Sequence, residues 1–264
     1  MRADWKSRYD VLTEAARVGG DFAKGIYDDT FDRRDLDVIR KADSSPVTIA
    51  DRGAEERIRA LIETHFPNDG FLGEEYGDRA GSTGYRWIID PIDGTKSFIR
   101  HVPIWGTLIG LDFGGEQIAG AAYIPVFGQM YRALRGDGAY LDDRRIRTSD
   151  IAELSQAILC YSSIQWFTKA GKQQEFLDFY RRTGRQRGYG DFYGFVLVAQ
   201  GSCDIMLEHG VSAWDIAATK AIIEEAGGRF TDWSGGGGID RPDVLATNGK
   251  LHDVSLEFLQ SCSG

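Results

Sequence analysis

The stretch WIIDPIDGTKSF at residues 87–98 contains the strongest structural signal in the chain. An apolar run ends at Asp90, Pro91 prevents ordinary strand pairing at the next position, and Gly94 permits a sharp turn into a helix. Asp90 and Asp93 are therefore expected at the end of a strand, beside the backbone N–H groups that begin a helix. Such N–H groups bind phosphate, and carboxylate oxygens bind Mg²⁺. The stretch predicts a corner that binds metal and phosphate together.

Acids elsewhere in the chain could complete such a site. Asp51 and Asp215 each stand three residues after a Thr or Ser, which is capping-box spacing, so each could instead only stabilise a helix start. Glu74 follows a glycine and could be an ordinary loop acid. For Asp90 and Asp93 a metal-binding role is favoured, because two acids that flank Pro-Ile at a strand end do little to stabilise a fold.

Outside this stretch the patterns predict a mixed α/β protein in two halves. Helical periodicity predicts one helix that ends before Asp28 and a second helix that begins near Thr48 and ends before Pro67. Short β-rich runs between residues 87 and 141 predict a largely antiparallel sheet. Strands and helices alternate beyond residue 150, which predicts a second sheet covered by helices. We expect an N-terminal half over residues 1–148 and a C-terminal half over 149–264.

Composition narrows the class of function. The chain has 264 residues, with 31 Lys and Arg against 40 Asp and Glu, and a net charge of −9 argues against nucleic-acid binding. An acidic protein that handles phosphate needs a cation. The absence of a long apolar segment predicts no membrane partner and a cytoplasmic location. Cys160, Cys203 and Cys262 lack metal-ligand spacing and are expected to be free thiols.

Several motifs, in order, resemble signatures of the inositol monophosphatase family. They are Gly73-Glu74-Glu75, the run from Trp87 to Thr95, Trp214-Asp215-Ile216-Ala217-Ala218 and Glu225-Ala226-Gly227-Gly228. The resemblance spans residues 41–228. It implies a layered αβαβα sandwich, usually a homodimer, with two or three Mg²⁺ ions between the halves and Li⁺ as a typical inhibitor.

The resemblance also implies roles for individual residues. The implied metal ligands are Glu74, Asp90, the carbonyl of Ile92, Asp93 and Asp215. Phosphate binding falls to Asp93, Gly94 and Thr95, and activation of the attacking water falls to Glu74, Thr95 and Asp51. Lys41 matches a lysine often found near the site, where it could contact substrate together with Asp215. A divalent cation makes a water nucleophilic near neutral pH, which agrees with this assignment.

The metal motif does not determine the alcohol part of the substrate, since the superfamily acts on inositol phosphates, fructose 1,6-bisphosphate and adenosine bisphosphates. Residues 96–109 and 187–194 resemble the histidinol-phosphatase branch, which implies hydrolysis of histidinol phosphate, a small phosphate ester of histidine biosynthesis. One departure is His101, where this branch commonly has glycine. An inositol monophosphatase, a broad-specificity phosphatase and a non-catalytic binding module are the alternatives, although no acid of the metal corner is missing.

Two further acids would suit histidinol phosphate, which carries an ammonium group and an imidazole. Asp191 and Glu208 could bind these groups by charge complementarity. Alternatively, Asp191 only caps the helix after Gly190, and Glu208 only ends a strand. The four histidines, at positions 65, 101, 209 and 252, have no metal-ligand spacing, and surface or structural roles are expected for them.

Overall fold

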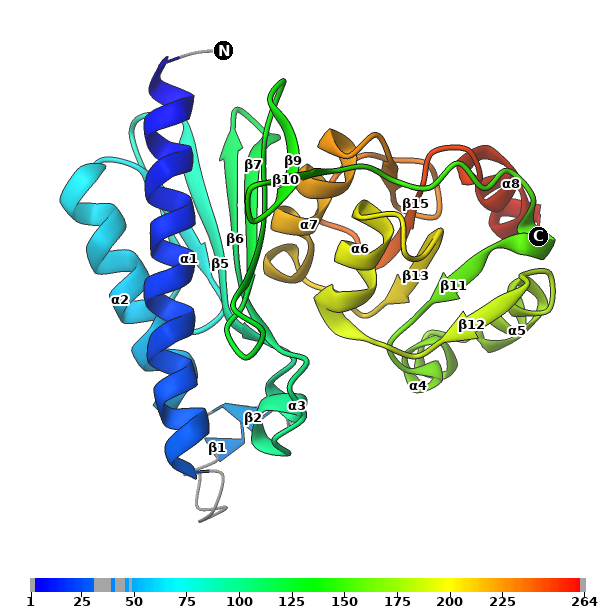
Figure 1. The fold of residues 1–264 in the computed structure, drawn as a ribbon, viewed down its shortest axis with the longest axis horizontal. Helices are drawn as coiled ribbons and strands as arrows, with labels where there is room; N and C mark the ends of the chain where they lie inside the picture. The colour runs from blue at the N-terminus through cyan, green and yellow to red at the C-terminus, as the bar shows by residue number, and fades with distance from the viewer. Residues whose placement is uncertain (1–2, 31–38, 41–45, 48, 262–264) are drawn as a thin grey trace.

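The computed structural model describes residues 3–30, 39–40, 46–47 and 49–261. Within these residues, helices and sheets alternate in five layers, which run from left to right in Figure 1. A pair of long helices is followed by an eight-stranded sheet, a second pair of helices, a five-stranded sheet and an outer helical layer. The αβαβα prediction for a mixed α/β chain is confirmed.

The first helical layer consists of α1 (Ala3–Thr30) and α2 (Ile49–His65), which pack on each other and on the larger sheet. Leu12 and Ile58 of these helices join Trp87 of the sheet in one buried core. The prediction that α1 ends before Asp28 is wrong, because the helix continues to Thr30. An ion pair from Lys24 to Asp28 and a hydrogen bond from Thr30 Oγ1 to the Ile26 carbonyl stabilise this last turn.

The larger sheet is almost entirely antiparallel, as predicted, with strand order β10-β9-β8-β7-β6-β5-β3-β4. Its strands are β3 (Gly70–Gly73), β4 (Gly77–Arg79), β5 (Tyr85–Asp93), β6 (Gly106–Phe113), β7 (Glu116–Ile124), β8 (Gln129–Leu134), β9 (Gly138–Leu141) and β10 (Arg144–Ile146). β3 is the exception, since it pairs in parallel with β5. A separate two-stranded ribbon joins β1 (Ile39–Arg40) to β2 (Pro46–Val47), and the short helix α3 (Thr95–Ile99) follows β5.

The second sheet has the order β12-β11-β13-β15-β14 and is mixed, with β11 parallel to both its neighbours. Its strands are β11 (Ile158–Cys160), β12 (Arg185–Arg187), β13 (Ile205–His209), β14 (Arg229–Thr231) and β15 (Asp243–Thr247). A 3₁₀ turn, η1 (Leu154–Gln156), precedes it, and its helices are α4 (Ile164–Lys169), α5 (Gln173–Tyr180), α6 (Asp191–Ala199), α7 (Ala213–Glu225) and α8 (His252–Ser261). β3 and β12 were not predicted, although β9, β11 and β14, which are equally short, were.

Helix α7 belongs to the second half of the chain but packs directly on the first sheet. Glycines on the sheet permit this close approach: a Cβ at Gly110 would lie 2.7 Å from the Cβ of Ala217, and one at Gly120 would lie 2.2 Å from the carbonyl oxygen of Ala218. The two halves therefore share a core across α7. The boundary predicted after residue 148 lies between β10 and β11 and stays a prediction.

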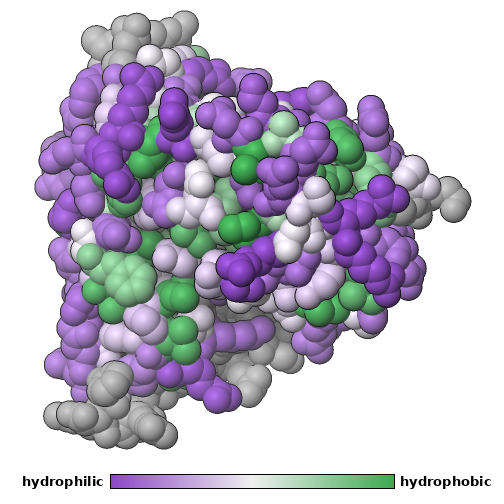
Figure 2. Space-filling model, turned by 45° about the vertical axis from the view of Figure 1, so that its right-hand side comes forward, coloured by the Kyte–Doolittle hydropathy of each residue, from purple (hydrophilic) through white to green (hydrophobic). Residues whose placement is uncertain are grey.

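Cys160 and Cys203 are free and buried, as predicted, and their sulfur atoms lie 2.9 Å apart. Cys262 lies outside the described residues. The face seen in Figure 2 is largely hydrophilic, with smaller hydrophobic patches between the polar side chains. No helix in the described part of the chain combines the length and apolarity needed to cross a membrane.

Candidate active site

A break in strand pairing creates the predicted corner at the end of β5. Pairing with β6 is regular up to Asp90 and then shifts before it resumes at Asp93. Within the shifted segment, Thr107 Oγ1 donates to the Pro91 carbonyl over 2.8 Å, and the Ile92 N–H donates to Asp90 Oδ1 over 3.0 Å. The proline and these two bonds stabilise the irregular backbone, so both acids face the same region although they are three residues apart.

Gly94 turns the chain from β5 into α3. Its φ of +86° lies in the left-handed region, which favours glycine. A Cβ at this position would also lie 3.2 Å from the Ile104 carbonyl oxygen and 3.3 Å from Asp191 Oδ2. The backbone at Gly94 and Thr95 is thereby left accessible at the edge of the acidic corner.

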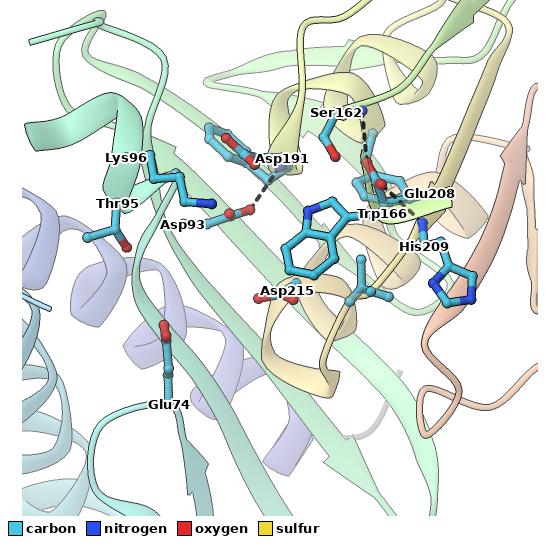
Figure 3. A pocket seen from close by; sticks show the side chains of 15 residues that line it. Glu74, Asp93, Thr95, Lys96, Ser162, Trp166, Asp191, Glu208, His209 and Asp215 are labelled. Carbon is cyan, nitrogen blue, oxygen red and sulfur yellow. Dashed lines mark hydrogen bonds between the residues drawn. The ribbon is translucent and has the colours of Figure 1, made fainter. Parts of the chain in front are cut away.

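A cavity of about 220 Å³ opens at this corner, between the two halves (Figure 3). It is lined by Glu74, Asp93, Gly94, Thr95, Lys96, Ser162, Trp166, Asp191, Phe192, Phe195, Glu208, His209, Gly210, Val211 and Asp215. The structure thus brings seven of the predicted site residues to one cavity. Asp51, Asp90 and Ile92 are buried beside it, and Lys41 lies outside the described residues.

The acids around the cavity repel one another in a buried environment. Burial raises the pKa of Asp90 well above its usual range, and the charges of Glu74 and Asp93 raise it further. The pKa of Asp93 is raised by burial and then by Asp191 and Asp215. Burial also raises the pKa of Asp215 to about 7. Such shifts are typical of carboxylates gathered for function, and a bound cation would reverse them.

Asp51 and Thr95 meet behind the cavity although they are 44 positions apart. Thr95 Oγ1 lies 3.5 Å from Asp51 Oδ1 and 3.1 Å from the Ile92 carbonyl oxygen. Asp51 is 1% exposed and is in the first turn of α2. The predicted helix start at Thr48 lies outside the described residues, so the capping-box alternative for Asp51 is not decided by the structure.

Asp215 stabilises a helix start and also lines the cavity. Its Oδ2 accepts the Ser212 N–H over 2.7 Å, as the capping-box interpretation expects. The other carboxylate oxygen is not used by this bond, so the capping and functional interpretations are compatible. Asp93 is similar, because its Oδ2 accepts the Phe192 N–H over 2.8 Å from the opposite half.

Asp191 and Glu208 also line the cavity. The alternative in which Asp191 caps α6 is wrong, because Gly190 is the N-cap and the Phe192 N–H in the first turn is accepted by Asp93. Asp191 instead adopts a left-handed φ of +47°, an unusual conformation that favours a functional position. Glu208 is buried inside β13, where its Oε2 accepts the Ser162 N–H and its Oε1 accepts the His209 N–H. Burial raises the pKa of Glu208 to about 7.

The donor set suits a hard cation, since it consists of several carboxylates and a backbone carbonyl. As they stand, however, no three His, Cys, Asp or Glu side chains of the described residues are arranged to hold a metal ion. Backbone N–H groups occupy one oxygen each of Asp90, Asp93 and Asp215. Modest side-chain movement would be needed to bind Mg²⁺, and the metal ligands stay a prediction.

Eight residues of the cavity were given no functional role from the sequence, among them Lys96, Ser162, Trp166 and His209. Lys96 directly follows the phosphate motif, and His209 follows Glu208, so adjacency could have indicated both. Trp166 lies in α4, a six-residue helix with no sequence signal. His101 has a φ of +55°, in the left-handed region that favours glycine, so the glycine expected here from the resemblance would fit this backbone.

Comparisons with known proteins agree with this geometry. Residues 4–262 match the model of the inositol monophosphatase family. The chain is 40% identical to a histidinol-phosphatase of Mycobacterium tuberculosis, covering 88% of this chain and 91% of the relative. It is 33% identical to a fructose-1,6-bisphosphatase/inositol-1-monophosphatase of Aquifex aeolicus, over 96% of this chain and 95% of the relative. The crystal structure of extragenic suppressor protein suhB from Bartonella henselae superposes with a TM-score of 0.89 at 28% identity, over 96% of this chain and 98% of that structure. The chain therefore belongs to the inositol monophosphatase family and is a phosphatase of small phosphate esters.

Proposed function

We propose that this phosphatase is Mg²⁺-dependent and hydrolyses histidinol phosphate to histidinol and phosphate, a step of histidine biosynthesis. The observation that carries the proposal is the composition of the single cavity around Asp93. The cavity combines the acids and the Gly94 turn that suit metal and phosphate with two further acids, Asp191 and Glu208. The similarity to the M. tuberculosis histidinol-phosphatase supports the same substrate.

Enzymes of this family are generally metal-dependent. In our proposal Glu74, Asp90, Asp93, Asp215 and the Ile92 carbonyl hold two or three Mg²⁺ ions. When bound, the ions supply positive charge for the phosphate oxygens and lower the pKa of a coordinated water. The raised pKa values of Asp90, Asp93 and Asp215 support this assignment, because a cation removes the repulsion that causes part of each shift.

The chain's own groups orient the reactants. The backbone at Gly94 and Thr95 binds the phosphate oxygens, as helix N-terminal N–H groups do. Thr95 has one hydroxyl proton, which lies within reach of the Ile92 carbonyl and of Asp51. In our proposal the hydroxyl donates to Asp51 and accepts a hydrogen bond from the attacking water; when the water is deprotonated, its proton passes to Thr95 as the Thr95 proton passes to Asp51. Glu74 lines the cavity on the same side and assists this water.

Asp191 and Glu208 contact the alcohol part of the substrate. Both line the cavity: Glu208 is buried within β13, whereas Asp191 is exposed and lies beside Asp93, as Figure 3 shows. Histidinol phosphate offers an ammonium group and an imidazole to these acids, whereas an inositol ring offers only hydroxyl groups. Two carboxylates in this position therefore favour the charged substrate.

A comparison of substrates tests the proposal. The wild-type enzyme, assayed with saturating Mg²⁺, should have a higher kcat/KM for histidinol phosphate than for inositol 1-phosphate. Glu208→Gln or Asp191→Asn should lower kcat/KM for histidinol phosphate at least about tenfold relative to inositol 1-phosphate, since truncating a desolvated charge pair is costly. Glu175→Gln, a change of an acid on α5 outside the cavity, serves as the control.

If the wild-type enzyme prefers the inositol ester, the histidinol assignment is withdrawn and the second candidate, an inositol monophosphatase, takes its place. Every acid that the family resemblance assigns to the metal corner is present, which argues against a non-catalytic binding module. The homodimer and the cytoplasmic location implied by the sequence stay predictions, and sedimentation velocity would test the first.

A further inference from the structure

Trp166 is a large aromatic residue of the cavity that none of the roles above uses. It lies in α4, lines the cavity together with Asp191 and Glu208, and remains 37% exposed. Figure 3 shows its indole between Asp215 and Glu208, in front of the cavity. An exposed aromatic ring that borders a polar pocket is suited to contact a ligand.

The indole has a well-defined position. The Ser162 N–H, just before α4, donates to Glu208 over 2.9 Å and so connects this helix to β13. Phe167, the next residue after Trp166, is fully buried and anchors α4 to the second core. Gly210 adopts a φ of +86°, and a Cβ there would lie 3.1 Å from the indole. The ring therefore lies against a backbone that has no side chain, and its distance from Glu208 is determined by the fold.

The ring already attracts cations from both halves of the molecule. The ammonium nitrogen of Lys169 lies 4.3 Å from the Trp166 ring, and that of Lys96, across the cavity on α3, lies 5.9 Å away. The second distance is near the outer limit of a cation–π interaction, which is about 6 Å. Lys96 lines the cavity and Lys169 does not, so a ligand cation that reaches the ring from the cavity competes with the distant contact of Lys96.

An indole on one side and a carboxylate on the other form a recognition site for a flat, positively charged ring. An imidazole ring can stack on the indole, and its N–H groups can donate to Glu208. The ring of an inositol phosphate has neither a π face nor a charge. It gains nothing from the indole beyond apolar contact.

We propose that Trp166 is a specificity residue that stacks on the imidazole ring of histidinol phosphate, with Glu208 as the partner of that ring's N–H group. This inference rests on the proposed function and deepens it. It assigns the choice between substrates to a residue that contacts neither the phosphate nor the metal ligands.

Two substitutions of similar size separate stacking from mere bulk. Trp166→Phe retains an aromatic face, and Trp166→Leu is apolar without one. Ile164→Leu, at an exposed residue of the same helix outside the cavity, is the control. For each enzyme, kcat and KM are measured on histidinol phosphate and inositol 1-phosphate with Mg²⁺. The affinity for histidinol, which has no phosphate, is measured by calorimetry.

Trp166→Leu should raise KM for histidinol phosphate and weaken histidinol binding about tenfold, with kcat and the inositol 1-phosphate kinetics changed less than about threefold. Trp166→Phe should keep histidinol affinity within about threefold. Equal losses on both substrates, or full histidinol affinity in Trp166→Leu, overturn the stacking role while the histidinol-phosphatase proposal stands. A wild-type preference for inositol 1-phosphate removes the proposed function itself, which is a separate result.

Discussion

Asp69 and the acids of the cavity lie near opposite ends of the larger sheet, and within the described residues Asp69 has an ion pair with a protein cation whereas Asp90, Asp93 and Asp215 have none. Asp69, just before β3, accepts two hydrogen bonds from the Arg8 guanidinium at 2.8 and 3.0 Å, and others from Thr83 and the Trp87 indole. This Asp69 cluster stabilises the packing of α1 on the sheet. Asp90, Asp93 and Asp215 lie at the other end of the same sheet.

The site acids have backbone N–H partners but no ion pair with Lys or Arg among the described residues. Asp69, Asp90 and Asp93 are buried and Asp215 is half-buried, so burial alone does not distinguish a structural acid from a functional one. The difference is the source of the compensating charge. A guanidinium of the fold neutralises Asp69, whereas in our proposal Mg²⁺ from solution neutralises the acids of the cavity.

Removal of metal is expected to have the largest effect on activity, because only the acids of the cavity are proposed to bind Mg²⁺. EDTA should abolish turnover and added Mg²⁺ should restore it, because the cavity acids cannot all be ionised together without cations. Mg²⁺ should also raise the melting temperature, since it binds the folded chain. Full activity in the presence of chelator would contradict the proposed metal dependence.

Amide substitution should affect the two groups in opposite ways. Asp69→Asn leaves the Arg8 guanidinium buried with an incomplete partner, so the free energy of unfolding should fall by about 3 kcal/mol or more. Asp90→Asn removes one of several repelling carboxylates. It should cost less than about 1 kcal/mol without metal but lower kcat at least about 10³-fold with Mg²⁺. Urea unfolding in EDTA and steady-state kinetics are measured for both variants. If Asp69→Asn and Asp90→Asn destabilise the protein equally, the distinction between a structural and a functional acid is refuted.

A threonine accompanies an acid in each group, which allows a matched pair of variants. Thr95→Ala should lower kcat about 10²-fold or more with a much smaller change in KM, because the hydroxyl that orients water is lost while the backbone N–H remains. Thr83→Ala, which removes the 2.6 Å bond to Asp69, should leave kcat unchanged and destabilise the protein by about 1 kcal/mol. Normal kcat in Thr95→Ala would exclude that residue from the mechanism.

The last expected effect is on the pH dependence of stability without metal. The folded pKa of Asp215, about 7, lies above its usual value of 3.8, so the folded state binds more protons between these values. Its contribution to stability is complete below about pH 4 and is lost as pH rises towards 7. One such proton changes the free energy of unfolding by about 1.4 kcal/mol per pH unit.

Asp215→Asn isolates this contribution from others in the same pH range. His252 opposes it, because burial lowers the pKa of this histidine to about 4 and its contribution is lost as pH falls from about 6.5. Both proteins contain His252, so its effect cancels when their unfolding curves are compared in EDTA. The wild-type protein should lose more stability than Asp215→Asn as pH rises from 4 to 7. Parallel pH profiles would rule out the raised pKa.

The sequence by itself determined the local features. Pro91 and Gly94 predict the break in β5 and the turn after it from their backbone restrictions alone, and periodicity predicts the long helices, whereas the order of the layers was implied by the family resemblance. The sequence could also nominate Asp90 and Asp93 as a pair, since they are only three positions apart. Short strands were predicted only in part, since β9 was predicted and β3 was not.

Only the tertiary structure decided which distant residues share the cavity. Asp51, Asp215 and Trp166 come from separate elements, and their proximity depends on how α2, α7 and α4 pack. Gly110 and Gly120 illustrate the reason: they admit α7 to the sheet and so bring Asp215 to the β5 corner. Local propensity acts within a few residues, whereas a site built from two halves depends on packing across the whole core.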